Sequence, residues 1–181
     1  MYQPRAKVEF VRRYCAPGQG WRTCVEIDAS EEGRTGGPRR TQAALNRRQE
    51  MQEDADRCRE EFKALRVNVG RRVEWCTEER VPNPAGAPSV IAYRDDAYLM
   101  AEVQAQSPGQ PGQSLDAAVG RMIRAASCAA VDGWRRDLVI VVCGAELEHH
   151  LRQMPALKRL GIAALALRRE QSEDEWFWTA L

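Results

Sequence analysis

Hydrophobic and polar positions follow two periods along this chain. Apolar residues recur at helical spacing over 41–65 and 115–131, and they run without interruption through 137–144, as in a strand buried on both faces. Alternation with a period of two appears over 88–104 and again in the tail at 174–181. The pattern predicts an α/β protein in which helices and strands follow one another.

The first forty residues carry a different pattern. Two short runs, 8–14 and 21–27, are rich in β-branched and aromatic residues and are separated by a Pro/Gly turn, whereas 28–40 is polar and Gly-rich. We therefore expect an N-terminal strand hairpin and a flexible loop in residues 1–40. They would be appended to a core at 41–181, with all 181 residues in a single domain.

From residue 41 the expected order is helix, strand, strand, strand, helix, strand, helix, strand. Thr41 suits the N-cap of the first helix, and Pro155 should interrupt the helix of 145–160. The early strands have short connections and should pair antiparallel, whereas the later ones are joined through helices and can be parallel. This order predicts a mixed central sheet with helices on both faces.

The segment 88–104 is the most informative part of the chain. It predicts two strands joined by a tight Arg-Asp-Asp turn, and the second strand carries Glu102 and Gln104 two residues apart. A period of two places both side chains on one face of the sheet, with Leu99, Ala101 and Val103 on the other. Two interpretations remain open: the polar pair lines a solvent face, or it belongs to a site with its own chemistry.

This order of elements, with Pro88 before the hairpin and Glu102-x-Gln104 within it, resembles the restriction-endonuclease-like superfamily, the PD-(D/E)xK nucleases. In that family a Pro-Asp begins the second core strand and a Glu-x-Lys lies in the third. A helix with a polar group and an apolar strand follow. The resemblance covers about 41–167 and implies an α-β-β-β-α-β-α-β core, with Mg²⁺-dependent hydrolysis of DNA as the activity.

The match to the family motif is partial. Ser89 stands where the family has its metal-binding Asp, Glu102 matches the acidic ligand, and Gln104 replaces the Lys. Serine is a poor ligand for Mg²⁺, and glutamine can hydrogen-bond a phosphate oxygen but carries no positive charge. The resemblance thus implies a catalytic centre of Ser89, Glu102 and Gln104 whose activity is weak or absent under ordinary Mg²⁺ conditions.

A second carboxylate would be needed beside Glu102 to hold a metal ion. Glu74 on the preceding strand is our candidate for this second ligand, while Glu78, Glu50 and Glu53 remain open as alternatives. If no acid compensates, the alternative function is a non-catalytic binding or scaffold protein that contacts DNA or a protein partner, including a second copy of itself. A weaker alternative is a Rossmann-like sensor of small ligands built on 137–167, although it lacks a Gly-rich phosphate loop.

Amino-acid composition gives little information about which class of partner this protein binds. The net charge is +1, from 27 basic and 26 acidic residues, so it neither supports nor excludes DNA. Only three of the basic residues are lysines, and arginine suits bidentate phosphate contacts, although a GC-rich genome would also enrich it. The candidate DNA-binding residues are Arg39, Arg40, Arg71, Arg72, Arg121 and Arg124.

Other residue types suggest no further chemistry. The six cysteines show no close pairing, which favours reduced core thiols in a cytoplasmic protein over a disulfide framework. Cys143 at the end of a buried strand is more typical of a core residue than of a nucleophile. His149 and His150 are consecutive and cannot form an i,i+4 metal pair. No segment reaches the length of about 18 apolar residues that spans a bilayer, so we expect no membrane partner.

Overall fold

The computed structural model describes the chain outside 1–2, 28–40, 71–87, 106–110, 128–132 and 170–175, with the backbone alone at 111–114, 169 and 176–178. The helices are α1 (Gln3–Tyr14), α2 (Gln42–Ala64), α3 (Pro111–Ser127), α4 (Ala145–Arg152) and α5 (Ala156–Arg159), with a 3-10 turn η1 (Pro17–Gln19). The strands are β1 (Arg22–Glu26), β2 (Asn68–Gly70), β3 (Val90–Arg94), β4 (Ala97–Ala105), β5 (Arg135–Cys143), β6 (Ile162–Arg169) and β7 (Trp176–Ala180).

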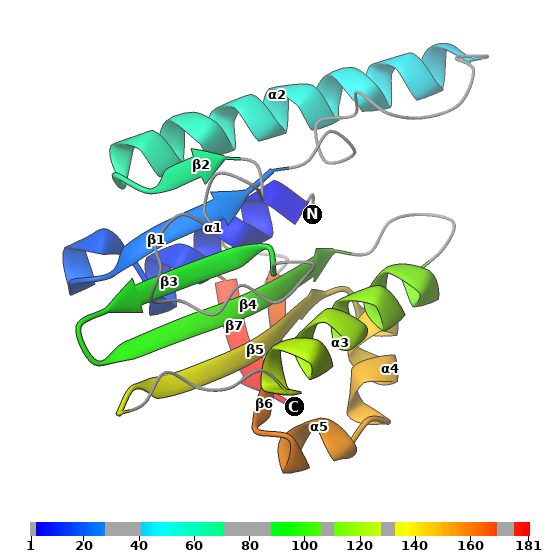
Figure 1. Ribbon diagram of the computed structural model, residues 1–181. Coiled ribbons are helices and arrows are strands. Elements are labelled where there is room, and N and C mark those ends of the chain that lie inside the picture. Colours follow the sequence, from blue (N-terminus) through cyan, green and yellow to red (C-terminus); the bar gives the residue numbers. More distant parts are fainter. Residues whose placement is uncertain (1–2, 28–40, 71–87, 106–110, 128–132, 170–175) are drawn as a thin grey trace.

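These strands form one sheet in the order β2-β1-β3-β4-β5-β6-β7 (Figure 1). β1 pairs antiparallel with β3 and β3 with β4, whereas β4, β5 and β6 are mutually parallel. β2 lies parallel to β1, and β7 lies antiparallel to β6. The expected mixed sheet, with early antiparallel strands and later parallel ones, is confirmed.

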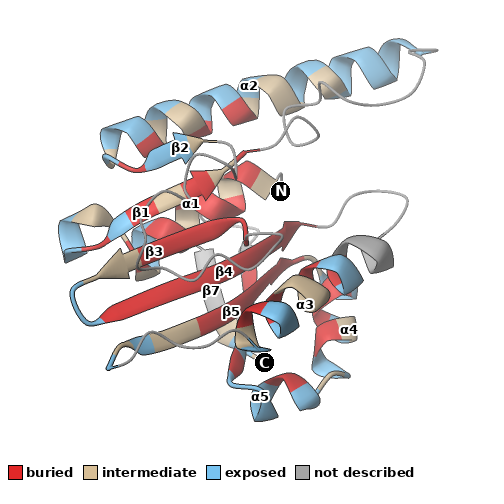
Figure 2. Ribbon diagram, in the orientation of Figure 1, coloured by how far each residue is buried: buried red, intermediate tan, exposed pale blue. Residues whose placement is uncertain are grey.

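Two helical layers cover the sheet. On one face α1 and α2 pack over the first four strands, with Phe10 and Phe62 fully buried in that cluster. On the other face α3, α4 and α5 pack over β4, β5 and β6, and Met122 and Leu147 are fully buried there. The central strand β4 is buried along its whole length because both layers cover it (Figure 2).

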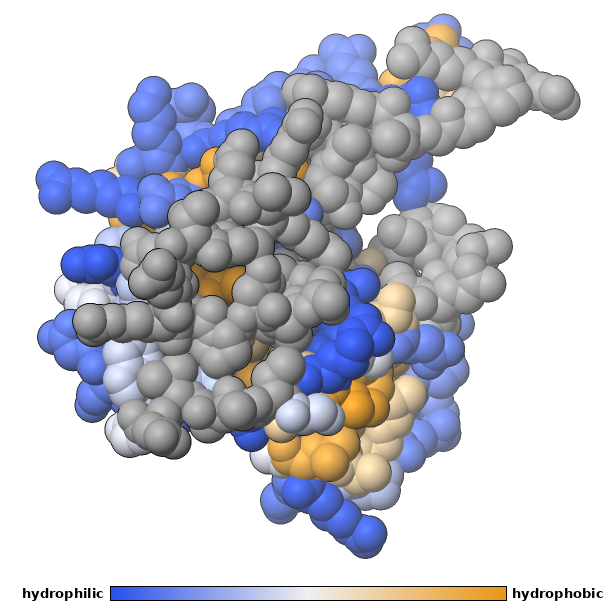
Figure 3. All heavy atoms as spheres, viewed as in Figure 1, coloured by the Kyte–Doolittle hydropathy of each residue, from blue (hydrophilic) through white to orange (hydrophobic). Residues whose placement is uncertain are grey.

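Helix α2 begins as expected, because the Thr41 side chain accepts a hydrogen bond from the backbone N–H of Ala44. Its buried residues, Ala55, Cys58 and Phe62, all lie in the C-terminal half. The N-terminal half extends past the sheet (Figure 1). Leu45, which we expected on the core face, is 36% exposed. Figure 3 shows that most of the α2 surface on this side is hydrophilic.

The strand expected at 8–14 is wrong, because these residues belong to α1. Burial of Pro4, Lys7, Val8 and Val11 follows the i, i+3, i+4, i+7 spacing of one helix face, and Pro4 lies in the first turn, where proline is tolerated. The β-branched and aromatic content of the run had favoured a strand. β1 then lies between β2 and β3, so the N-terminal segment is part of the sheet and its cover, not a hairpin appended to it.

The other expected elements differ mainly at their ends. Helix α3 begins at Pro111, before the N-cap expected at Ser114. The helix expected at 145–160 is interrupted at Pro155, which separates α4 from α5, as expected. The tail forms β7. Of the strand expected at 67–78 the structure describes only β2, since the rest lies outside the described residues. Within the described part of the chain, no helix is both long and apolar enough to cross a membrane.

Candidate functional site

Glu102 and Gln104 lie on the same face of β4, as the alternation predicted. Both point toward α3, and the Gln104 amide donates to Glu102 Oε2 at 3.4 Å. Leu99, Ala101 and Val103 belong to the core cluster beneath α1 and α2, on the opposite face. Glu102 is 1% exposed and Gln104 is 5% exposed, so the pair does not line an open solvent face.

An arginine of α3 holds the Glu102 carboxylate. Arg121 Nε lies 2.5 Å from Oε1 and Arg121 Nη2 lies 3.0 Å from Oε2, which is a bidentate contact. The Arg121 side chain is 18% exposed, so most of this ion pair is shielded from water. A carboxylate buried this deeply needs a cation or several hydrogen-bond donors, and Arg121 provides both.

Ser89 lies next to Glu102, on the neighbouring strand. The pairing of Val90 with Ala101 continues in register to place Ser89 opposite Glu102. The Ser89 hydroxyl accepts from the backbone N–H of Val103 at 3.0 Å and donates to the carbonyl of Ala101 at 3.3 Å. Serine at this position therefore extends the β3–β4 pairing through its side chain.

Glu26, at the end of β1, is a neighbour that sequence reasoning missed. Its backbone N–H donates to the Ser89 carbonyl at 3.0 Å. Val25 is buried in the cluster beneath α1 and α2, so alternation along β1 places the half-buried Glu26 on the face of Ser89 and Glu102. Glu26, Ser89 and Glu102 thus lie side by side across three adjacent strands. The signal in the sequence was a polar residue ending a strand that buries Thr23 and Val25.

Helix α1 donates hydrogen bonds to β1 and β4, the two strands on either side of Ser89. The Lys7 ammonium, on a residue only 1% exposed, donates to the backbone carbonyl of Glu26. Gln3 Nε2 donates to the backbone carbonyl of Val103 at 2.7 Å. These contacts explain polar residues on the buried side of α1, which the sequence analysis did not single out.

The described residues do not fit a Mg²⁺ centre. Both oxygens of Glu102 already contact Arg121, and the Ser89 hydroxyl is bonded to backbone groups. In the described part of the chain no three His, Cys, Asp or Glu side chains are grouped to hold one ion. Of the other acids that the sequence analysis considered, Glu50 and Glu53 belong to α2, which packs on the opposite face, whereas Glu74 and Glu78 lie outside the described residues and stay predictions.

The candidate arginines separate into three groups. Arg121 is engaged with Glu102, whereas Arg124, one turn later on α3, is exposed. Arg39, Arg40, Arg71 and Arg72 lie outside the described residues and stay predictions. A further arginine, Arg22 of β1, was not among the candidates.

Arg22 is exposed and belongs to β1, near the face of the sheet that α3 covers in part. Its guanidinium lies 5.9 Å from the ring centroid of Tyr93 on β3, and Tyr93 packs against the cluster beneath α3. Cation–π contacts of this kind leave an arginine and an aromatic ring together at the protein surface.

Three of the described cysteines, Cys15, Cys58 and Cys143, are buried core residues, whereas Cys24 is half-buried. Burial raises the pKa of the Cys143 thiol to about 12, and the residue is only 5% exposed, so its place before α4 does not activate it. Burial likewise raises the pKa values of Cys15 and Cys58 to about 12. The prediction that these residues are free thiols in the core is confirmed for Cys15, Cys58 and Cys143.

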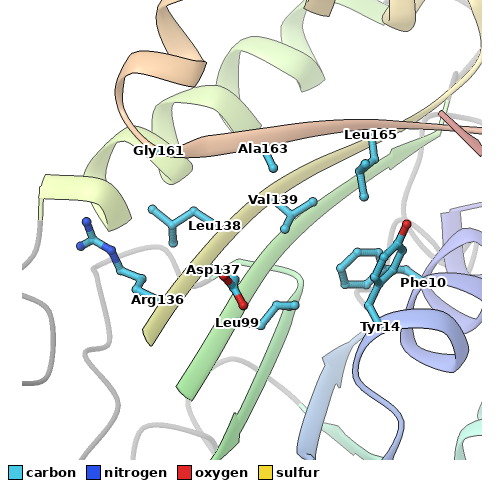
Figure 4. Close-up of a pocket in the computed structure, with 10 residues that line it drawn as sticks. All are labelled: Phe10, Tyr14, Leu99, Arg136, Asp137, Leu138, Val139, Gly161, Ala163 and Leu165. Carbon is cyan, nitrogen blue, oxygen red and sulfur yellow. The ribbon is translucent and has the colours of Figure 1, made fainter. Parts of the chain in front are cut away.

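A cavity of about 320 Å³ lies on the other face of the sheet, between α1 and strands β5 and β6 (Figure 4). Phe10, Tyr14 and Leu165 form much of its apolar wall. Its carboxylate, Asp137, is paired with Arg135 at 2.9 Å. The described lining is mostly apolar and its carboxylate is already engaged with an arginine, so the chemistry of the molecule is better sought at Glu102.

Comparisons with known proteins leave this site as the basis of any functional argument. Scans of protein-family models, of curated proteins and of solved structures each found no match to this chain.

Proposed function

We propose that this chain is a non-catalytic DNA-binding protein with a restriction-endonuclease-like arrangement, in which an internal ion pair stands where a metal centre would be. The bidentate contact between Arg121 and Glu102 carries the proposal. It engages both oxygens of the one carboxylate that matches the family motif and neutralises its charge. The alternative of an active Mg²⁺-dependent nuclease would require that contact to open and a second acid to approach.

The order of elements supports the family part of the proposal. The pattern α-β-β-β-α-β-α-β can be followed from α1 through β1, β3, β4, α3, β5, α4 and β6, with α2 and β2 as an insertion. In this assignment the first three strands are antiparallel neighbours in the sheet. The resemblance would then begin near residue 3 instead of 41, because β2 lies beside β1 and not beside β3.

The local chemistry supports the loss of catalysis. Metal-assisted hydrolysis needs an ion that activates water and stabilises charge on the phosphate. Here the cation beside Glu102 is a guanidinium, which cannot lower the pKa of a bound water in that way. Ser89 contributes backbone hydrogen bonds instead of a charged oxygen.

The surface beside α3 supports DNA as the partner. On this side the helices lie over β4, β5 and β6, and no described helix lies over β1 and β3 (Figure 1). Arg124 on α3 and Arg22 on β1 border that part of the sheet, with Tyr93 between the helix and Arg22. Arginines at the border of the sheet can contact phosphates, and these contacts position a duplex without reading its sequence.

The test combines binding and cleavage on one duplex oligonucleotide. Affinity is measured by fluorescence anisotropy over a salt series for the wild type, for Arg22→Ala with Arg124→Ala, and for the control Arg57→Ala. Arg57 is exposed on α2, which packs on the opposite face. We expect the double variant to weaken binding and to reduce the log–log salt slope by about 0.9 per lost phosphate contact, with no change for Arg57→Ala.

Cleavage is assayed on the same duplex with Mg²⁺ and with Mn²⁺, and we expect none. Binding that is undetectable at low salt would contradict DNA as the partner. Metal-dependent cleavage that Glu102→Gln abolishes would contradict the non-catalytic part of the proposal. Binding that Arg57→Ala weakens as much as the double variant would contradict the surface that we name.

A further inference from the structure

The cavity beside α1 combines apolar walls with a carboxylate. Its volume of about 320 Å³ falls at the lower end of the range of small-molecule sites. The rings of Phe10 and Tyr14, whose centroids are 5.1 Å apart, lie on one side of the cavity, and Val139 and Leu165 line it from the sheet (Figure 4). Small-molecule sites typically pair such apolar walls with a few polar groups that orient the ligand.

Small residues keep the cavity open at the protein surface. Ala163, which lines it from β6, is exposed, and so is Gly161, which precedes that strand. Gly161 has a φ of 72°, a left-handed conformation that favours glycine, and a Cβ built on it would meet no described atom within 4 Å. Because solvent reaches these two lining residues, a ligand can enter the cavity from their side.

Asp137 is the charged side chain that β5 directs toward the cavity. Val139, two residues later, belongs to the core cluster beneath α1, whereas Leu138 belongs to the cluster beneath α3. Alternation along the strand therefore places Asp137 on the cavity side and Arg136 on the α3 side. Figure 4 shows the Arg136 guanidinium extending away from Asp137. The charge that a ligand meets inside the cavity is therefore that of a carboxylate.

One oxygen of this carboxylate remains open to a ligand. Arg135 contacts Asp137 through Nε at 3.1 Å and through Nη2 at 2.9 Å, and both contacts are to Oδ2. Oδ1 accepts no hydrogen bond from the residues that the structure describes, although a carboxylate has about four lone-pair positions. A protonated amine brings N–H donors and a positive charge, so it is the head group that complements Oδ1.

We propose that this cavity binds a small primary amine with an apolar body. The ammonium group contacts Oδ1 of Asp137, and the body packs between Phe10, Tyr14 and Leu165. A nucleotide fits less well, because the cavity lies near the amino ends of the parallel strands β5 and β6, whereas doubly wound folds bind nucleotides at the carboxyl ends. The proposal is independent of DNA binding, since the surface that we propose for DNA lies on the other face of the sheet.

Binding of tryptamine at neutral pH tests the proposal, with calorimetry for affinity and ¹H–¹⁵N NMR for location. We expect a dissociation constant of about 0.1–1 mM, as is usual for a ligand of this size. Amide shifts should concentrate at 137–139 and 161–165. Indole-3-propionate, which carries a carboxylate on the same ring system, is the matched ligand. It should bind at least about tenfold more weakly because its charge has the sign of Asp137.

Two substitutions distinguish the walls of the cavity from its carboxylate. Ala163→Phe fills the cavity from an exposed position and should abolish detectable binding of tryptamine, and Ala156→Phe, also exposed but on α5, is its control. Asp137→Asn should weaken binding at least about tenfold, because a charge-assisted hydrogen bond is lost. Its control is Asp56→Asn at an exposed position on α2, which should leave the affinity unchanged.

Three results would overturn the proposal. The first is no binding at tryptamine concentrations up to about 10 mM, and the second is binding that a folded Ala163→Phe variant retains. The third is a set of amide shifts that lies away from 137–139 and 161–165. Indole-3-propionate that binds as tightly as tryptamine would overturn the amine as the head group. If circular dichroism shows that Ala163→Phe is unfolded, Ala163→Leu replaces it under the same criteria.

Discussion

Two arginine–carboxylate clusters lie on the same side of the sheet and place very different demands on the fold. Glu102 projects from the middle of β4, is 1% exposed and is paired with one arginine, Arg121. Glu148 projects from α4, is 7% exposed and accepts from two arginines, Arg152 and Arg168. The side chains of these two arginines are 48% (Arg152) and 56% (Arg168) exposed.

The difference shows what burial does to the same pair of functional groups. At Glu148 each arginine is hydrated and the other remains if one is removed, so the cluster ties α4 to β6 at little risk. At Glu102 Arg121 is the one cation that the described residues provide, so its loss leaves a buried carboxylate with only the Gln104 amide as a described side-chain partner. The Glu148 cluster is therefore part of the structural support, whereas the Glu102 pair bears on the chemistry that we propose for the site.

The substitution Arg121→Met removes one partner of the buried Glu102 ion pair and should have the largest effect on stability. We expect the free energy of unfolding to fall by about 3–5 kcal/mol, because removal of one partner strands a buried carboxylate. Urea denaturation measures the loss, and Arg124→Met is the matched control. Arg124 is exposed on the same helix and should change stability by less than about 0.5 kcal/mol. Equal effects of the two variants would contradict the importance of the ion pair.

Adding Glu102→Leu to Arg121→Met should recover most of that loss. A buried ion pair replaced by apolar residues of similar size is often neutral in stability, because both desolvation penalties disappear together. A double-mutant cycle from the same denaturation curves gives the coupling energy. Losses that simply add would show that the two side chains do not compensate one another.

Ser89→Ala probes the other half of the motif. We expect a loss of about 1–3 kcal/mol, because the buried backbone N–H of Val103 would be left without its acceptor. Ser127→Ala is the control, since its hydroxyl donates to the Ile123 carbonyl at an exposed position on α3. A loss no larger than that of the control would mean that the hydroxyl does not support the β3–β4 pairing.

Arg152→Ala tests the Glu148 cluster, in which the two arginines are exposed, and should have the smallest effect of these substitutions. We expect a loss of less than about 1 kcal/mol that shrinks further at high salt, since Arg168 still pairs with Glu148. Denaturation at low and high salt measures it. A salt-independent loss as large as that of Arg121→Met would remove the contrast between the two clusters.

Glu148 also predicts a pH dependence. Hydrogen bonds from Arg168, followed by those from Arg152, hold the pKa of Glu148 below the ordinary 4.5 despite the opposing effect of burial. A carboxyl with a lowered pKa contributes stability above pH 4.5 that is lost as the pH falls through its folded value. Stability measured below pH 4.5 should therefore decline more steeply in the wild type than in Glu148→Gln. Parallel declines would contradict the shift.

The sequence predicted the part of the site that depends on local pattern. Alternation in 88–104 placed Glu102 and Gln104 together and away from Leu99, because the strand period is fixed by backbone geometry. It could not place Arg121 beside Glu102, since that contact joins residues 19 apart on different elements, and Arg121 was assigned to phosphate instead. Local composition mispredicted α1: the β-branched and aromatic residues of 8–14 favoured a strand, whereas burial of Pro4, Lys7, Val8 and Val11 follows the spacing of a helix face.

Anomalous diffraction from crystals soaked in Mn²⁺ tests the central claim most directly, because it locates the cation beside Glu102. Our account predicts no manganese peak at the carboxylate and Arg121 in contact with both of its oxygens. A manganese ion bound to Glu102, with Arg121 displaced and a second acid completing the coordination, would contradict it.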